Sequence, residues 1–322
     1  MTATSNLPTI KGFTWRGIGP TDGPMLEKFE EACSRLDGAT NLKTSDEWNA
    51  LTKEEGINTR SLLAVNAHNE IAIAGWYEVD ERVENVLAFL EGRVHPEFRG
   101  KRYGTALLNW LEKNTGAKMK ALAGERDCTY RIMFYDRAPD APALFEKKGY
   151  MLQYIEQEME RDLNQPWPVI NSQNLSFEPW TEDNKADFYK VYKEAFRTRT
   201  DNPMKAEAWH HHFANPESSD YQSGLSLLAR HSGNPVAYAV IHTEESPDDL
   251  AWVTQTGVHA DYRRQGIGAA LLIETMKELR EAGFQKVKLS VNVDNPGAKS
   301  LYEHLGFSLM NSFTMYYREL DR

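Results

Sequence analysis

The chain has 322 residues, 41% of them hydrophobic and 26% charged, a balance typical of a folded globular protein and not of a disordered one. Its net charge of −10 argues against a general nucleic-acid binder, because binding phosphates requires clustered lysine and arginine. Cys33 and Cys128 lack metal-ligand spacing and indicate reduced thiols. No apolar run is long enough for a membrane helix. We therefore expect a cytoplasmic protein that binds neither nucleic acid, membrane nor metal.

The sequence contains an internal repeat. Residues 94–108 read VHPEFRGKRYGTALL, and residues 258–272 read VHADYRRQGIGAALL. A second pair of similar segments follows, PALFEKKGY ending at Tyr150 and KSLYEHLGF ending at Phe307. Two long copies indicate tandem domains rather than a solenoid. We predict a first domain over 1–165, a linker rich in proline and asparagine over 166–174, and a second domain over 175–322.

Each half follows the same order of predicted elements, and the second half is the clearer one. Its strands are expected first, followed by alternating helices and strands, which is typical of an α+β fold with a mixed sheet. The stretch over 198–222 is polar and variable. The predicted strands cover 175–180, 225–230, 235–243, 250–258, 286–293 and 307–318, and the predicted helices cover 182–197, opened by Thr181, 267–282 and 296–305.

The segment from Arg263 to Gly268, RRQGIG, lies between a predicted strand and a predicted helix. Glycines let a ligand approach the backbone closely, and the first amides of a helix have no helical acceptor. Together with the helix dipole they can bind a phosphate, and the arginines can add charge-assisted bonds. The alternative is a glycine-containing turn with solvated arginines.

A second motif follows after the next predicted strand, and its residues have a fixed spacing. Asn295 stands seven residues before Tyr302, which precedes the pair Gly306-Phe307. In this order, the two motifs closely resemble those of the GNAT superfamily of acyl-CoA-dependent N-acetyltransferases. The resemblance covers most of residues 175–319 and extends more weakly over the first half. It implies two tandem GNAT-like domains, each a splayed mixed sheet flanked by helices.

The resemblance also implies roles for residues of the second domain. Backbone groups near Thr256 and Val258 would bind the pantetheine arm of acetyl-CoA, and the amides of the turn would bind its pyrophosphate. Tyr302 would protonate the leaving thiolate from a helix start; the alternative for this side chain is a core aromatic. The implied cofactor-binding residues are Thr256, Val258, Arg263, Arg264, Gly266, Ile267, Gly268, Ala269 and Asn295.

The first copy departs from this pattern at three positions. Arg102 replaces Gly266, Phe145 replaces Tyr302, and Asp140 stands near the position of Asn295. Phenylalanine cannot donate a proton, and an arginine side chain would crowd a phosphate. We therefore expect the first domain to be a degenerate copy, although weak CoA binding there stays open.

The general base is left open by the sequence. The strand before the turn carries no carboxylate, and the alternatives are His242, a water chain, or one of the acidic residues near the start of that strand. These acidic residues are Glu244, Glu245, Asp248 and Asp249. The expected lining of the acceptor pocket comes from the variable stretch and includes Trp209, His212, Phe213 and Tyr221.

The resemblance favours an acetyl-CoA-dependent N-acetyltransferase whose second domain acts on a small-molecule primary amine by direct attack on the thioester. Two other functions remain open at this point. One is acetylation of a protein N-terminus or lysine. The other is a non-catalytic protein that binds or senses acyl-CoA.

Overall fold

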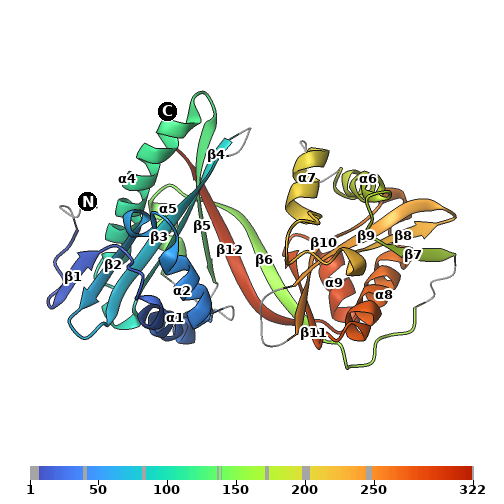
Figure 1. Ribbon diagram of the computed structural model, residues 1–322, viewed down its shortest axis with the longest axis horizontal. Coiled ribbons are helices and arrows are strands. Elements are labelled where there is room, and N and C mark those ends of the chain that lie inside the picture. Colours follow the sequence, from blue (N-terminus) through green and yellow to red (C-terminus); the bar gives the residue numbers. More distant parts are fainter. Residues whose placement is uncertain are drawn as a thin grey trace. The chain divides into compact units, whose positions relative to one another are not determined.

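The computed structural model describes residues 7–38, 42–81, 85–135, 138, 140–170, 174–197, 204–243 and 249–320. Contacts between residues divide the chain into two compact units (Figure 1). Unit 1 comprises Met1–Ile155 and Asn311–Arg322, and unit 2 comprises Glu156–Met310. None of the helices in the described parts of the chain has the length and apolar character needed to cross a membrane.

Unit 1 is built on a mixed sheet with the strand order β1-β2-β3-β4-β5-β12. Among its described strand pairs, β4 and β5 are parallel and the others are antiparallel. Two hydrophobic clusters cover the sheet, one containing residues of α4 and the other residues of α1 and α2. The strands are β1 (Phe13–Arg16), β2 (Ser61–Asn66), β3 (Ile71–Glu81), β4 (Asn85–Val94), β5 (Asp127–Tyr135) and β12 (Ser308–Glu319), and the helices are α1 (Gly23–Asp37), α2 (Ser45–Lys53), α3 (Ile57–Arg60), α4 (Tyr103–Ala123) and α5 (Ala141–Lys147).

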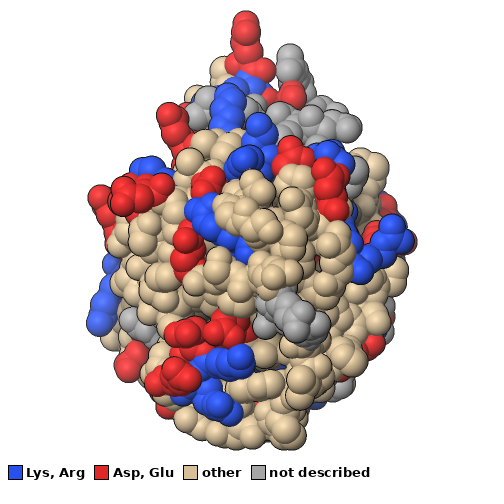
Figure 2. Space-filling view, turned by 90° about the vertical axis from the view of Figure 1, so that its right-hand side faces the viewer, with Lys and Arg blue, Asp and Glu red and all other residues tan. Residues whose placement is uncertain are grey.

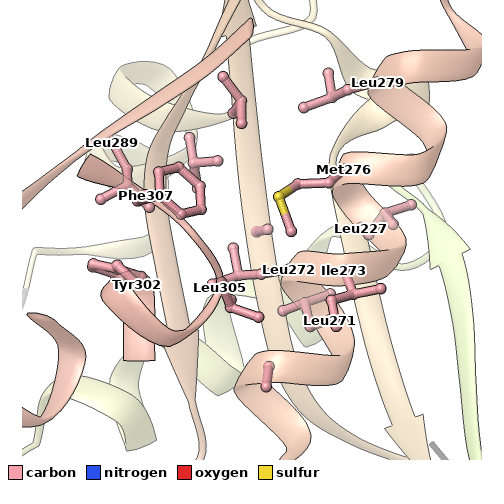
Figure 3. Close-up of a cluster of buried hydrophobic side chains, with 14 of the residues drawn as sticks. Leu227, Leu271, Leu272, Ile273, Met276, Leu279, Leu289, Tyr302, Leu305 and Phe307 are labelled. Atoms are coloured by element: carbon pink, nitrogen blue, oxygen red, sulfur yellow. The ribbon is translucent and has the colours of Figure 1, made fainter. Parts of the chain in front are cut away.

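Unit 2 repeats this plan with the strand order β6-β11-β10-β9-β8-β7; of the strand pairs in its described part, β10 and β11 are parallel and the others antiparallel. A cluster with residues of α8 and α9 covers one face (Figure 3), and an aromatic cluster with residues of α6 and α7 covers the other. The strands are β6 (Met151–Asp162), β7 (Leu175–Pro179), β8 (Leu227–His231), β9 (Asn234–Thr243), β10 (Leu250–Val258) and β11 (Lys286–Asn292), and the helices are α6 (Lys185–Phe196), α7 (Ala206–Phe213), α8 (Ile267–Glu281) and α9 (Pro296–His304).

The last strand of each repeat belongs to the sheet of the other unit. Residues 156–162 of β6 pair with β11 of unit 2, and residues 313–319 of β12 pair with β5 of unit 1. The division by contacts therefore follows these exchanged strands. The linker expected at 166–174 marks where the first copy of the sequence repeat ends, and it stays a prediction. Residues 171–173 of this linker lie outside the described part of the chain.

One expectation for unit 2 was wrong, and one helix of unit 2 was not predicted. Helix α6 begins at Lys185 and not at 182, because Thr181 and Asn184 first close a turn in which the Thr181 amide donates to Asn184 Oδ1 at 2.8 Å. The stretch expected to be variable and polar contains α7, which places Trp209 fully inside the aromatic cluster. Bulky aromatic residues at helical spacing, such as Trp209 and Phe213, were the available signal for this helix.

Candidate active site

Strands β10 and β11 separate part of the way along their length. They pair in register from Leu250↔Lys286 to Val253↔Leu289, whereas β10 pairs with β9 as far as Val258. Beyond Leu289, the pairing of β11 among the described residues is with β6. The backbone of residues 254–258 therefore has an open edge, and an extended ligand can add to it as a strand does. This confirms the splayed mixed sheet expected from the sequence.

A β-bulge lies where the separation begins. The register of β10 against β9 shifts between Val253 and Gln255, so Thr254 is the extra residue. Bulges turn side chains away from the regular alternation of a strand and are common beside active sites. Here Thr254 Oγ1 lies 2.9 Å from His242 Nδ1, while Gln255 Oε1 accepts hydrogen bonds from other residues of the aromatic face. Two consecutive polar side chains thus reach the same side of the sheet.

Gln255 is held by two buried donors. Its Oε1 accepts from Trp209 Nε1 at 2.6 Å and from the Tyr238 hydroxyl at 2.7 Å. Because an indole nitrogen only donates, the atom facing Trp209 is the carbonyl oxygen, which fixes the direction of the Gln255 amide. Burial raises the pKa of Tyr238, so its hydroxyl stays protonated and can donate. Sequence reasoning missed this contact, because it joins residues that are 46 and 17 positions apart in the chain.

The turn before α8 presents unpaired amides, as the sequence predicts. Arg264 and Gly266 have positive φ angles of 59° and 78°, and Gly266 caps the helix. Within the described residues, the amides of Arg264, Gly266, Gly268 and Ala269 have no hydrogen-bond acceptor. Together with the dipole of α8, these groups are able to donate hydrogen bonds to an anion such as a phosphate.

The two glycines of the turn are required for different reasons. A Cβ on Gly266 would meet nothing within 4 Å, so this position needs glycine for its positive φ. A Cβ on Gly268 would lie 3.2 Å from Val258 Cγ2, so this position lets α8 approach β10 closely. Ile267 and Ala269, which each follow one of these glycines, are buried and anchor the helix. Thr256 is fixed by its hydroxyl, which donates to the Tyr238 carbonyl at 2.9 Å.

The side chains of the two arginines have different environments. Arg263 Nε donates to the Val258 carbonyl at 3.3 Å, and its Nη2 donates to the Ala195 carbonyl. The Arg263 guanidinium therefore fastens the end of β10 to α6. Arg264 is exposed at the turn. The role of Arg263 in cofactor binding stays a prediction. Its contacts show that it also holds the end of β10 in place against α6.

Tyr302 lies near the C-terminal end of α9, and the expectation that it stands at a helix start was wrong. Its side chain is 6% exposed, and its ring centroid lies 6.0 Å from that of Phe307 (Figure 3). Leu305 lies next to it in the same cluster. Asn295 caps α9 and is half-buried, and its carbonyl accepts the amides of Ala298 and Lys299 at 3.1 Å.

Unit 1 keeps the backbone of the turn and loses other features. Gly100 and Arg102 have φ angles of 74° and 62°, at the positions equivalent to Arg264 and Gly266. The pairing of β3 with β4 runs from Ile73↔Val94 to Glu81↔Val86 without a register shift, so β4 lacks the bulge. Phe145 packs against the rings of unit 1, 5.5 Å from that of Phe134.

The residues expected to line the acceptor pocket differ in their exposure to solvent. Trp209 and Tyr221 are buried, with 0% and 6% exposed, whereas His212 is exposed and Phe213 is half-buried. Of the candidate bases, Glu244, Glu245 and Asp248 lie outside the described residues. Asp249 has a positive φ of 46° and accepts the Gln285 amide through its carbonyl at 3.1 Å.

Comparisons with known proteins agree with this geometry. The sequence profile of the acetyltransferase (GNAT) family matches residues 177–307. The chain is 27% identical over 298 residues to a mycothiol acetyltransferase of Thermomonospora curvata, covering 89% of this chain and 90% of that protein. A mycothiol acetyltransferase of Nocardiopsis dassonvillei is 25% identical over 250 residues, covering 69% of this chain and 72% of that protein.

Solved structures share the fold of the whole chain. A GCN5-related N-acetyltransferase from Sphaerobacter thermophilus has a TM-score of 0.79 at 24% identity, with 98% of this chain and 97% of that chain covered. A tandem GNAT protein from the clavulanic acid biosynthesis pathway has a TM-score of 0.65 at 12% identity, with 96% and 99% covered. At these identities the likeness shows the fold alone. Residues 177–307 thus match the GNAT acetyltransferase family, and the chain as a whole shares the fold of tandem GNAT proteins; together with the mycothiol acetyltransferase relatives, these findings support an N-acetyltransferase.

Proposed function

We propose that the protein transfers the acetyl group of acetyl-CoA to a primary amine of a small molecule, and that unit 2 carries the chemistry. The observation that supports this most directly is the open edge of β10 over residues 254–258, which leads into the turn before α8. An extended pantetheine arm fits the open edge, and a pyrophosphate fits the turn. The cofactor-binding residues proposed are those named from the sequence, with Asn295 at the cap of α9.

The chemistry follows from this placement. A backbone amide on the open edge of β10 polarises the thioester carbonyl, and the amine nitrogen attacks its carbon to form a tetrahedral intermediate. The C–N bond forms, the C–S bond breaks, and no acyl-enzyme is needed. Tyr302 donates its phenolic proton to the departing thiolate. Unit 1 supports the fold as a degenerate copy, because Phe145 has no proton to give and β4 has no bulge.

Two observations favour a small acceptor over a protein. The relatives that cover most of the chain are mycothiol acetyltransferases. The face of unit 2 shown in Figure 2 has basic and acidic side chains interspersed over its described part, with no broad field of one sign to bind a charged polypeptide. A non-catalytic role as a sensor of acyl-CoA is the second alternative, and the role of Tyr302 separates it from catalysis.

The test is a panel of primary amines, with CoA release measured by a thiol reagent. The catalytic proposal expects release with at least one small amine, and expects Tyr302→Phe to lower turnover while calorimetry finds acetyl-CoA binding retained. Tyr316→Phe serves as the control, because this tyrosine of unit 1 is also buried, at 5% exposed, and should leave turnover unchanged. Unchanged turnover in Tyr302→Phe would exclude this phenol as the acid. No release with any amine, despite acetyl-CoA binding, would favour the sensor.

A further inference from the structure

We propose that the attacking amine gives its proton to the hydroxyl of Thr254, whose own proton passes to His242. This rests on the proposed function, and it assigns the proton acceptor that the sequence leaves open. The geometry that points to it is a polar pair at the bulge of β10, where Thr254 Oγ1 lies 2.9 Å from His242 Nδ1.

Thr254 stands where a thioester and an amine would meet. It directly follows Val253, the last residue of β10 that pairs with β11, and is therefore the first residue of the open edge. The bulge leaves Thr254 without a partner residue in the register with β9 and brings its hydroxyl to His242 on the aromatic face. Its side chain is half-buried, so a substrate can reach it, whereas His242 is 9% exposed and stands behind it.

The contact between Thr254 and His242 allows the direction of hydrogen bonding that a base needs. Thr254 Oγ1 has one proton and two acceptors within reach, His242 Nδ1 at 2.9 Å and the Val240 carbonyl at 3.4 Å. In the proposed arrangement the neutral imidazole carries its hydrogen on Nε2, and the hydroxyl donates to Nδ1, which is the nearer of the two acceptors. The ring is held in place by Tyr221, which forms a β-bridge with His242 and packs at a centroid distance of 5.4 Å.

The surroundings keep the imidazole neutral at neutral pH. Among the described residues, the titratable groups facing His242 are Asp220 and Tyr221, from the segment before β8, and His212 of α7; β10 presents the Thr254 hydroxyl. Burial lowers the pKa of His242, Asp220 opposes this, and His212 lowers the pKa further. Burial raises the pKa of Tyr221, which stays uncharged. A neutral imidazole is the form that can accept a proton.

The proton transfers balance the reaction. As the C–N bond forms, a proton leaves the amine nitrogen for Thr254 Oγ1, and the Thr254 proton moves to Nδ1, which gives an imidazolium on His242. As the C–S bond breaks, the thiolate takes its proton from the acid assigned to Tyr302. His242 then loses its proton and Tyr302 regains one through solvent, which restores both groups. No other reactant is consumed.

The experiment measures CoA release with a productive amine as a function of pH, together with the Kd for acetyl-CoA. His242→Gln is expected to lower kcat by about 10²- to 10⁴-fold and to remove the acid limb of the wild-type profile, which should lie below the ordinary His value of 6.5. Thr254→Val should also lower kcat, and Thr254→Ser should restore most of it, because serine keeps the hydroxyl. His68→Gln, which changes an exposed histidine of unit 1, is the matched control and should match the wild type.

The outcomes separate the two proposals. If the wild type releases CoA and His242→Gln keeps both its rate and its acid limb, the proton acceptor is another group and this inference is overturned. Equal rates for Thr254→Val and Thr254→Ser would also overturn it, and this pair remains decisive if His242→Gln does not fold. If none of the amines in the panel leads to CoA release by the wild type, the proposed function fails, and the inference fails with it.

Discussion

Replacing Gly266 by arginine copies the turn of unit 1 into unit 2. The backbone there has φ of 78°, and a Cβ would meet nothing within 4 Å. The cost in stability is therefore conformational and not steric, about 1 kcal/mol for placing an L-residue in the left-handed region. For a domain of this size, that lowers Tm by about 2–4 °C, which differential scanning calorimetry resolves. Arg102, with φ of 62°, shows that an arginine fits this backbone.

The same change should weaken the binding of acetyl-CoA more than it weakens the fold. The new side chain begins where a phosphate would approach the Gly266 amide. Losing one hydrogen bond to a charged group costs about 1.5–3 kcal/mol, and each 1.4 kcal/mol is about tenfold, so the KM for acetyl-CoA should rise by about 10- to 100-fold. Steady-state kinetics at saturating amine measures this at the catalytic unit alone.

Gly100→Arg is the matched control for this prediction. Its φ is 74°, and its Cβ would also meet nothing within 4 Å, but it lies in the turn of unit 1. It should lower Tm by a similar amount and leave the KM for acetyl-CoA unchanged. The reasoning is refuted if Gly266→Arg lowers Tm yet leaves KM at the wild-type value, because the phosphates would then bind elsewhere.

Four further predictions test other parts of the structure. Arg102→Gly relieves a left-handed arginine and should raise Tm by about 2–4 °C in a thermal scan. Gln255→Leu leaves two buried donors without an acceptor and should lower the free energy of unfolding by about 2–4 kcal/mol in urea titrations, whereas Gln255→Glu keeps an acceptor oxygen and should lose less. Arg161→Met removes the donor to three carbonyls and should cost about 3 kcal/mol by the same measurement. Burial raises the pKa of Cys33 to about 11, so a thiol reagent at pH 8 should label it only after unfolding; rapid labelling of the native protein would contradict its burial.

The sequence predicts the position of the turn before α8 well because its determinants are local, whereas the binding of a phosphate there stays a prediction. A glycine at a positive φ, a helix start and an apolar strand before it can all be read within 20 residues, and β10 has the predicted bounds Leu250–Val258. The separation of β10 from β11 was expected only through the family resemblance, since nothing local shows where two strands stop pairing. For the same reason the bulge at Thr254 was not predicted.

The exchanged strands were not predictable in this way. The pattern of residues 307–318 indicates a strand, and β12 is there, but alternation does not specify the neighbour to which a strand pairs. The direction of the Arg263 side chain is another example. The spacing of the motif suggests a phosphate ligand, whereas the Ala195 carbonyl that it contacts lies 68 residues away in the sequence.

The exchange of β6 and β12 has a consequence for the order in which the protein can be assembled during synthesis. The residues of β5 emerge early, but the strand that pairs with them comes after all of unit 2. Until residues 313–319 are made, the edge of β5 in unit 1 has no strand of its own unit to pair with, and an unpaired edge is a site for aggregation. Unit 1, which begins the chain, thus completes its sheet last. Separating the halves at residue 170 would leave each piece with the closing strand of the other, and mixing the two pieces should restore both sheets.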